Sequence, residues 1–430
     1  MPTIADHFAA ILKDATLHHT SLDLGPGKDL YSLLRSAAND PNAAGAELAE
    51  GDGPEQILKK IKDSLEKHGP AVIDPRLASK LAQAVGFSEL PGDRPYETFD
   101  PGWIECLLNY YKYRNDKIKF PSPAKPGDVV QALINKPALK IGIVGDWGTG
   151  GPIAKSVIDA MQEHKPDYAI HLGDVYYSGD SAQETANFLQ AWCFPEARSY
   201  ALNSNHEMYS GGRGYYGTLL KDSKFASQQG IGYFALTNDQ WLIIGLDSAY
   251  FTASHLYQDG ALCRTDLTDP QAEGMVQVEW LKWVLQEHPQ KRVILMTHHD
   301  GFDVSPSTGK VTTKPLYRQV SALMQGIKDW WWYWGHVHTV IAYQQIFLPH
   351  NSTVSTRCVG HGAIPYMPFQ RDLHRLGGGD VKVTWAETDL ARDPAIPLRA
   401  PCGFLLLTLT GADLKEEFYD ENNRQRWSNH

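Results

Sequence analysis

The stretch YAIHLGDVYY, residues 168–177, carries the strongest indication of the fold. It begins with a largely apolar run, Tyr168 to Leu172, which is typical of a short buried strand, and the pair Gly173-Asp174 ends that run. A carboxylate at the carboxyl end of a strand lies where open α/β sheets bind their ligands. Taken alone, Gly-Asp after a strand is more often a simple turn, so the rest of the chain decides its meaning.

Four other strand-like runs also end in residue types that bind metals. They are Lys140–Val144 before Gly145-Asp146, Arg198–Leu202 before Asn203-Ser204-Asn205-His206-Glu207, Arg292–Thr297 before His298-His299-Asp300, and Asp329–Trp334 before Gly335-His336-Val337-His338. Five such fragments, each at a strand-to-loop boundary, are hard to attribute to chance. Asp, Asn and His form an oxygen and nitrogen ligand set that suits zinc, iron or manganese better than copper(I) or iron–sulfur clusters. The sequence therefore predicts a metal site, expected to hold two ions.

The order of these motifs resembles that of the calcineurin-like metallophosphoesterases, over roughly Lys140 to Gly362. Within that superfamily the chain is most similar to the purple acid phosphatases. Gly148 stands where many other branches have a histidine, and Tyr177, three residues after Asp174, stands where purple acid phosphatases have a tyrosine ligand. Ser204 departs from the glycine that usually precedes Asn-His-Glu.

The resemblance implies two metal ions, iron paired with zinc, manganese or a second iron. It implies Asp146, Asp174, Tyr177 and His338 as ligands of the first ion, and Asp174, Asn205, His298 and His336 as ligands of the second. Asp174 would then bridge, as required because two cations ~3.5–4 Å apart repel each other. A water between such ions has its pKa lowered from ~15.7 toward ~7, which would provide a hydroxide nucleophile near neutral pH.

Four further residues are candidates for catalysis or substrate binding. His206 resembles the family's histidine near the substrate phosphate, and it would either bind that phosphate or protonate the leaving oxygen. Glu207 could orient His206. His298 and His299 are adjacent and would point in different directions from an extended turn. The family's ligand position is the first, so His299 is left to the surroundings of the ligands, as a candidate for substrate binding. His361, in a glycine-rich turn, either faces the site or is simply a loop histidine.

The expected function is metal-dependent hydrolysis of a small phosphorylated substrate, with a phosphomonoester as the first choice. The alternatives are a phosphodiesterase, nuclease or phospholipase of the same fold, or a non-catalytic binding module. The binding module is disfavoured because every ligand position is filled. With 40 Lys and Arg against 50 Asp and Glu, the net charge is −10. That charge argues against bulk binding of nucleic acid or of an anionic membrane, since both need a basic face.

Several features of the chain favour a cytoplasmic protein. Its five cysteines lack a C-x-x-C pair, as expected for reduced thiols. The first residues have no basic start followed by an apolar middle, and no run reaches the apolar length of a membrane span. Delivery by a leaderless secretion route would leave no trace in the sequence.

The chain is expected to divide into two parts. Residues 1–135 have a mostly helical pattern without ligand motifs, typical of a support or a lid, and Pro121–Asp128 is the best linker candidate. Residues 136–430 would form the metallophosphoesterase domain. From Lys140 onward, strands alternate with helical segments, which predicts an α/β fold. Two packed sheets flanked by helices would make a four-layer sandwich.

Overall fold

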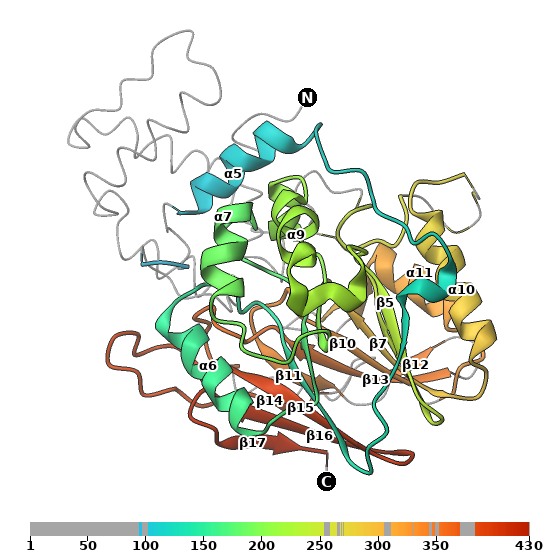
Figure 1. Ribbon diagram of the computed structural model, residues 1–430. Coiled ribbons are helices and arrows are strands. Elements are labelled where there is room, and N and C mark those ends of the chain that lie inside the picture. Colours follow the sequence, from blue (N-terminus) through green and yellow to red (C-terminus); the bar gives the residue numbers. More distant parts are fainter. Residues whose placement is uncertain are drawn as a thin grey trace, which may run out of the picture.

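The computed structural model describes residues 94–96, 102–252, 259–264, 267, 269, 271–304, 311–328, 330–343, 346–348, 352–369 and 383–429 (Figure 1). The helices expected before residue 94 lie outside these residues. Within the described ranges, two mixed sheets pack face to face with helices outside them, so the predicted α/β sandwich is confirmed. None of the helices in this part of the chain is long and apolar enough to cross a membrane.

The smaller sheet has six strands. Their order is β17 (Gln425–Ser428), β16 (Asp413–Asp420), β15 (Gly403–Thr410), β2 (Leu139–Val144), β3 (Tyr168–His171) and β4 (Ser199–Ala201). Strands β2, β3 and β4 are parallel neighbours, and β15 runs antiparallel to β2. Three of the five strands that were predicted to end in ligand residues therefore lie side by side.

The larger sheet has nine strands. Along its main path lie β1 (Val130–Ala132), β5 (Phe234–Thr237), β6 (Trp241–Gly245), β7 (Arg292–Thr297), β10 (Trp330–Trp334), β13 (Ser352–Val359), β11 (Val340–Tyr343) and β14 (Val383–Ala386), while β12 (Ile346–Leu348) pairs with β13. Strands β6, β7, β10 and β13 are parallel. Strand β1 pairs with β5, so this sheet already begins a few residues before the boundary expected at 136. A separate hairpin joins β8 (Phe302–Val304) and β9 (Val311–Thr313).

Two hydrophobic cores explain the tryptophan-rich strand β10. Trp330, Trp332 and Trp334 pack into the core under helices α10 (Met275–Glu287) and α11 (Pro315–Leu323). Tyr333 points the other way, into the core between the two sheets. Successive side chains of a strand face opposite sides, so a strand inside a sandwich must be apolar on both faces.

Helices cover both outer faces of the sandwich (Figure 1). Helix α6 (Pro152–Glu163) packs closely on β2, because a Cβ atom at Gly142 would come within 2.8 Å of the sulfur of Met161. Helices α10 and α11 lie on the opposite side of the molecule. The remaining short helices are η2 (Pro126–Val129), α7 (Ser181–Gln183), η3 (Glu184–Leu189), α8 (Asn205–Tyr209), α9 (Arg213–Gly217), η4 (Leu219–Lys221) and η5 (Ser223–Gln228).

Helix α5 (Gly102–Tyr113) connects the N-terminal part of the chain to the loops that follow β3 and β4. Tyr110 meets Tyr209 of α8 edge-on, with ring centroids 6.5 Å apart. The amide of Asn109 donates a hydrogen bond to the hydroxyl of Ser178 at 2.7 Å. Asn109 and Tyr110 thus pack helix α5 onto these loops.

Candidate metal centre

The predicted ligands come together where the parallel strands of both sheets end. Asp146 and Asp174 follow β2 and β3, and Asn205 begins α8 just after β4. His298 and His336 follow β7 and β10 of the other sheet. Parallel strands open their carboxyl ends onto one edge, which is where α/β sheets bind ligands. His298 Nε2 lies 3.2 Å from Asp174 Oδ1, so the edges of the two sheets meet at a single site.

The backbone marks three of these residues independently of the sequence motifs. Asp146, Asp174 and His336 have φ angles of 57°, 77° and 63°. A residue with a Cβ atom is disfavoured in this left-handed region, at a cost of roughly 1–3 kcal/mol. Backbone held there against that cost clusters at functional sites.

A first group of ligand atoms comes from Asp146, Asp174 and His338. One such atom from each lies within 4.8 Å of the other two, and all three residues are buried. His338 Nε2 is 3.5 Å from Asp146 Oδ1 and 3.9 Å from Asp174 Oδ2. Asp146 Oδ1 accepts no hydrogen bond from the described residues. Two buried carboxylates and an imidazole directed at one point fit a bound cation.

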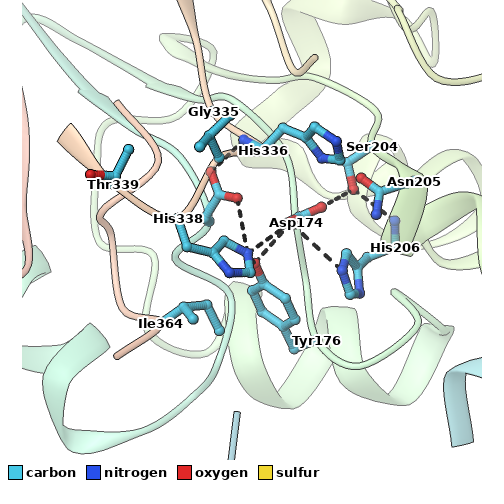
Figure 2. A network of polar contacts seen from close by, with 12 residues as sticks. Asp174, Tyr176, Ser204, Asn205, His206, Gly335, His336, His338, Thr339 and Ile364 are labelled. Carbon is cyan, nitrogen blue, oxygen red and sulfur yellow. Dashed lines mark hydrogen bonds and ion pairs between the residues drawn. The ribbon is translucent and has the colours of Figure 1, made fainter. Parts of the chain in front are cut away.

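A tyrosine also reaches this first group, and it is Tyr176. Its hydroxyl donates a hydrogen bond to Asp174 Oδ2 at 2.8 Å and lies 2.9 Å from His338 Nε2 (Figure 2). The sequence prediction placed Tyr177 here. The ring of Tyr177 instead stacks on Tyr96, with centroids 5.0 Å apart, and lies against Gly102 of α5. Tyr96 also meets the Tyr176 ring, with centroids 5.5 Å apart, but it is the Tyr176 hydroxyl that contacts Asp174 and His338.

A second group surrounds His298. Its Nδ1 lies 2.9 Å from the carbonyl oxygen of Leu172, which can only accept a proton, so Nε2 carries a lone pair. That Nε2 lies 2.9 Å from Asn205 Oδ1, 3.2 Å from Asp174 Oδ1 and 3.2 Å from His336 Nδ1. A lone pair that faces two oxygen acceptors has no proton to share with them. A cation between these atoms would accept all of their lone pairs and remove the repulsion between them, so this group also fits a metal.

His299 joins the second group as well. One ligand atom from each of His298, His299 and His336 lies within 4.8 Å of the other two. The ring centroids of His299 and His336 are 4.5 Å apart, and those of His298 and His299 are 4.8 Å apart. The sequence prediction directed His299 toward the substrate, whereas the structure brings its ring to the predicted ligands.

Asp174 lies between the two groups, with Oδ1 toward His298 and Oδ2 toward His338 and Tyr176 (Figure 2). Burial raises the pKa of Asp146 well above its usual range, and the charge of Asp174 raises it further. Burial acts on Asp174 in the same direction, but His206 and His298 outweigh it and hold the pKa of Asp174 well below its usual range. A cation between the carboxylates would let both ionise.

His206 is held by its backbone contact beside Asp174. Its Nδ1 lies 2.6 Å from the carbonyl oxygen of Tyr177, which leaves Nε2 as the lone-pair nitrogen, 3.8 Å from Asp174 Oδ2 (Figure 2). Burial lowers the pKa of His206, although Asp174 acts to raise it. The ring can therefore face a ligand bound next to Asp174.

Glu207 and Ser204 form the support beneath this site. Glu207 Oε1 accepts a hydrogen bond from the backbone N–H of Val175 at 3.1 Å, and Oε2 contacts the Ser204 hydroxyl. The same hydroxyl contacts Asp174 Oδ1 and caps α8 by accepting the N–H of His206. Burial raises the pKa of Glu207 to about 8. These contacts place Glu207 under the Asp174 turn, whereas the His206 ring is oriented by the Tyr177 carbonyl.

The structure does not bring His361 into either group. It is buried beside Phe418, with ring centroids 5.8 Å apart, and burial alone lowers its pKa to about 3. Tyr176 and Ser204 are the site residues that sequence reasoning missed. Ser204 appeared only as a departure from a family glycine, although serine is a strong helix N-cap and α8 begins just after it. Tyr176 was missed because the motif pointed to Tyr177, the next residue of the same type.

The match to a known protein family covers the part of the chain that carries the site. Residues 139–340 match the family model of calcineurin-like phosphoesterases. A comparison with curated protein sequences finds no significant match. Every residue of the two groups falls inside the matched range.

Three solved structures align with the chain at low similarity. GAP50, described as the anchor in the inner membrane complex of Plasmodium, is 11% identical and covers 68% of this chain and 88% of its own, with a TM-score of 0.44. The purple acid phosphatase PPD1 of yellow lupin is 14% identical, with coverages of 68% and 53% and a TM-score of 0.41. PhoD is 12% identical, with coverages of 72% and 74% and a TM-score of 0.43. TM-scores of this size carry no inference about activity. Residues 139–340, just under half of the chain, are thus recognised as a calcineurin-like phosphoesterase region.

Proposed function

We propose that this protein is a phosphoric ester hydrolase whose site holds two metal ions. The first ion would be held by Asp146, Asp174, His338 and the hydroxyl of Tyr176, and the second by Asp174, Asn205, His298 and His336. The observation that carries the proposal is the convergence of the His298 lone pair with Asn205 Oδ1 and Asp174 Oδ1 at 2.9 and 3.2 Å.

The two groups differ in charge, which bears on the identity of the metals. The first group contains two carboxylates and a tyrosine. The second group has one carboxylate, that of Asp174, which it shares with the first, and its other ligands are neutral imidazoles and an amide. More negative ligands favour a more highly charged ion, so the first group suits ferric iron and the second a divalent ion such as zinc, manganese or ferrous iron. When bound, the ions would supply an acidified water and positive charge opposite the phosphoryl oxygens.

The residues of the chain have distinct tasks in this proposal. Asp174 holds the two groups together, and the Ser204 hydroxyl fixes its orientation from below. His206, with Nδ1 committed to the Tyr177 carbonyl, presents Nε2 beside the site. Once its Nε2 takes up a proton, a histidine in that position can donate that proton to the leaving oxygen, and the rate of monoester hydrolysis depends strongly on it when the leaving group is basic. We therefore propose a small phosphomonoester as the substrate.

Metal reconstitution with an ester panel tests the proposal. Protein stripped with a chelator and reloaded with iron and zinc should hydrolyse aryl and alkyl phosphate monoesters, and diesters less well. His288→Ala, at the distant end of α10, serves as the control and should behave like the wild type. Fully loaded protein that turns over diesters but not monoesters would overturn the choice of substrate. Fully loaded protein that turns over neither would make the chain a non-catalytic binding module.

A further inference from the structure

The second group contains one more imidazole than the proposed function requires. His299 lies with His298 and His336 in a set whose ligand atoms are all within 4.8 Å of one another. All three histidines are buried. The proposed function needs only His298 and His336 from this set, so the third ring lacks a role there.

Contacts behind His299 fix the orientation of its ring. Nδ1 lies 3.0 Å from the hydroxyl of Ser248, which also accepts the backbone N–H of His299 at 3.1 Å. Ser248 is buried just beyond strand β6, next to β7 in the same sheet. Gly260 also packs against His299, so closely that a Cβ atom at Gly260 would lie 2.5 Å from the His299 Cβ.

This arrangement is typical of a metal-binding histidine. Such a residue usually donates its other ring N–H to a nearby oxygen, which sets the tautomer and the direction of the coordinating nitrogen. The Ser248 hydroxyl can accept Nδ1–H of His299, and in that tautomer the lone pair of His299 is on Nε2.

We propose that His299 is a third imidazole ligand of the second metal, with Ser248 as its positioning residue. The inference rests on the proposed function and deepens it. The second ion would then have five protein donors: Asp174, Asn205, His298, His299 and His336. Three imidazoles select borderline ions such as zinc, cobalt or ferrous iron, and disfavour magnesium and calcium, which prefer oxygen.

Zinc titration of the intact chain tests the assignment. Iron-loaded protein is titrated with zinc for the wild type, His299→Ala, Ser248→Ala and the control His288→Ala. We expect one zinc per chain in the wild type and the control. His299→Ala should weaken zinc binding at least ~10-fold, and Ser248→Ala should weaken it ~10-fold or more while leaving the iron content unchanged. An unchanged zinc affinity in His299→Ala would overturn the assignment.

A second measurement does not depend on any variant remaining folded. X-ray absorption at the zinc edge of the iron–zinc wild-type protein counts the imidazoles bound to the second ion. Three imidazoles support the proposal, and two overturn it, leaving His299 as a substrate contact. Either of these results with full hydrolytic activity leaves the proposed function intact. A wild-type protein that binds no zinc at all would overturn both.

Discussion

The hydroxyl of Tyr176 lies 2.8 Å from Asp174 Oδ2, and it is this tyrosine, not its neighbour, that reaches the centre. Burial and the charges of Asp174 and Asp146 raise the pKa of Tyr176 well above its usual range. A phenolate at neutral pH therefore requires a strongly acidic cation such as ferric iron.

We expect the ferric protein to show a visible phenolate-to-iron absorption that Tyr176→Phe abolishes. Tyr177→Phe is the matched control, because it removes the same hydroxyl one residue away, and it should retain the band. The measurement is a visible spectrum of each iron-loaded variant. A band lost in Tyr177→Phe and kept in Tyr176→Phe would restore the assignment made from the sequence motif.

His206 should affect substrates according to their leaving groups. If its Nε2 protonates the leaving oxygen, His206→Ala should lower kcat/KM for alkyl phosphates by ~10²–10⁴-fold and for activated aryl phosphates far less. The ratio of the two losses is the quantity to measure. Equal losses for both substrates, expressed mainly in KM, would show that His206 only anchors the phosphate.

His171 should make the fold sensitive to acid. It is fully buried among Trp147, Phe188 and Trp192, neither ring nitrogen has a hydrogen-bond partner among the described residues, and burial lowers its pKa from 6.5 to about 3. Below pH 6.5 the unfolded chain binds a proton at His171 that the folded chain does not bind. The contribution of neutral His171 to the free energy of unfolding is therefore fully present above pH 6.5 and is lost as the pH falls toward 3.

Replacing His171 by Phe should remove that loss. The free energy of unfolding of His171→Phe, relative to wild type, should rise by about 2 kcal/mol when the pH is lowered from 8 to 5. This figure follows because pH 5 lies about 1.5 units below the pKa of histidine in the unfolded chain, and each unit corresponds to about 1.4 kcal/mol. Any constant packing cost of the larger ring cancels in this difference. Denaturant titrations at the two pH values measure it, and parallel changes in both proteins would exclude His171 as an acid-sensitive group.

Tyr96 should stabilise the loop that orients His206. Its ring stacks on Tyr177 with centroids 5.0 Å apart, and its hydroxyl donates a hydrogen bond to the carbonyl of Thr149 at 3.0 Å. Removing the ring in Tyr96→Ala should cost roughly 0.5–1.5 kcal/mol from the aromatic contact and lower kcat/KM. Tyr96→Phe keeps the stack and should lose less. Thermal melts and kinetics that do not distinguish Tyr96→Ala from wild type would contradict this role.

Much of this site could be predicted from the sequence because its ligands end strands. The apolar runs before Asp146, Asp174, His298 and His336 are buried strands in the structure, and parallel pairing brings their ends together. Such a pattern identifies which loop carries a ligand.

The direction of individual side chains within those loops could not be predicted in the same way. Tyr176 and Tyr177 are chemically identical, and Tyr96 packs against both rings. They differ in their other contacts, because the Tyr177 ring lies against Gly102 whereas the Tyr176 hydroxyl contacts Asp174. His298 and His299 were expected to point in different directions, because adjacent side chains do so in an extended turn. The backbone after β7 leaves the strand, and Ser248 then holds the second ring beside the first. Contacts between distant segments decide both cases.

The metal content of the wild-type protein and of Asp174→Asn tests the central claim most directly. The Asp174 carboxylate contacts His298 of one group and His338 of the other, and without its charge two cations at this spacing would lose the anion that offsets their repulsion. We predict two metal ions per chain in purified wild type, fewer than one in Asp174→Asn, and nearly abolished hydrolysis in the variant. A wild-type chain that binds no metal, or an Asp174→Asn variant that retains both ions and normal turnover, would contradict the account.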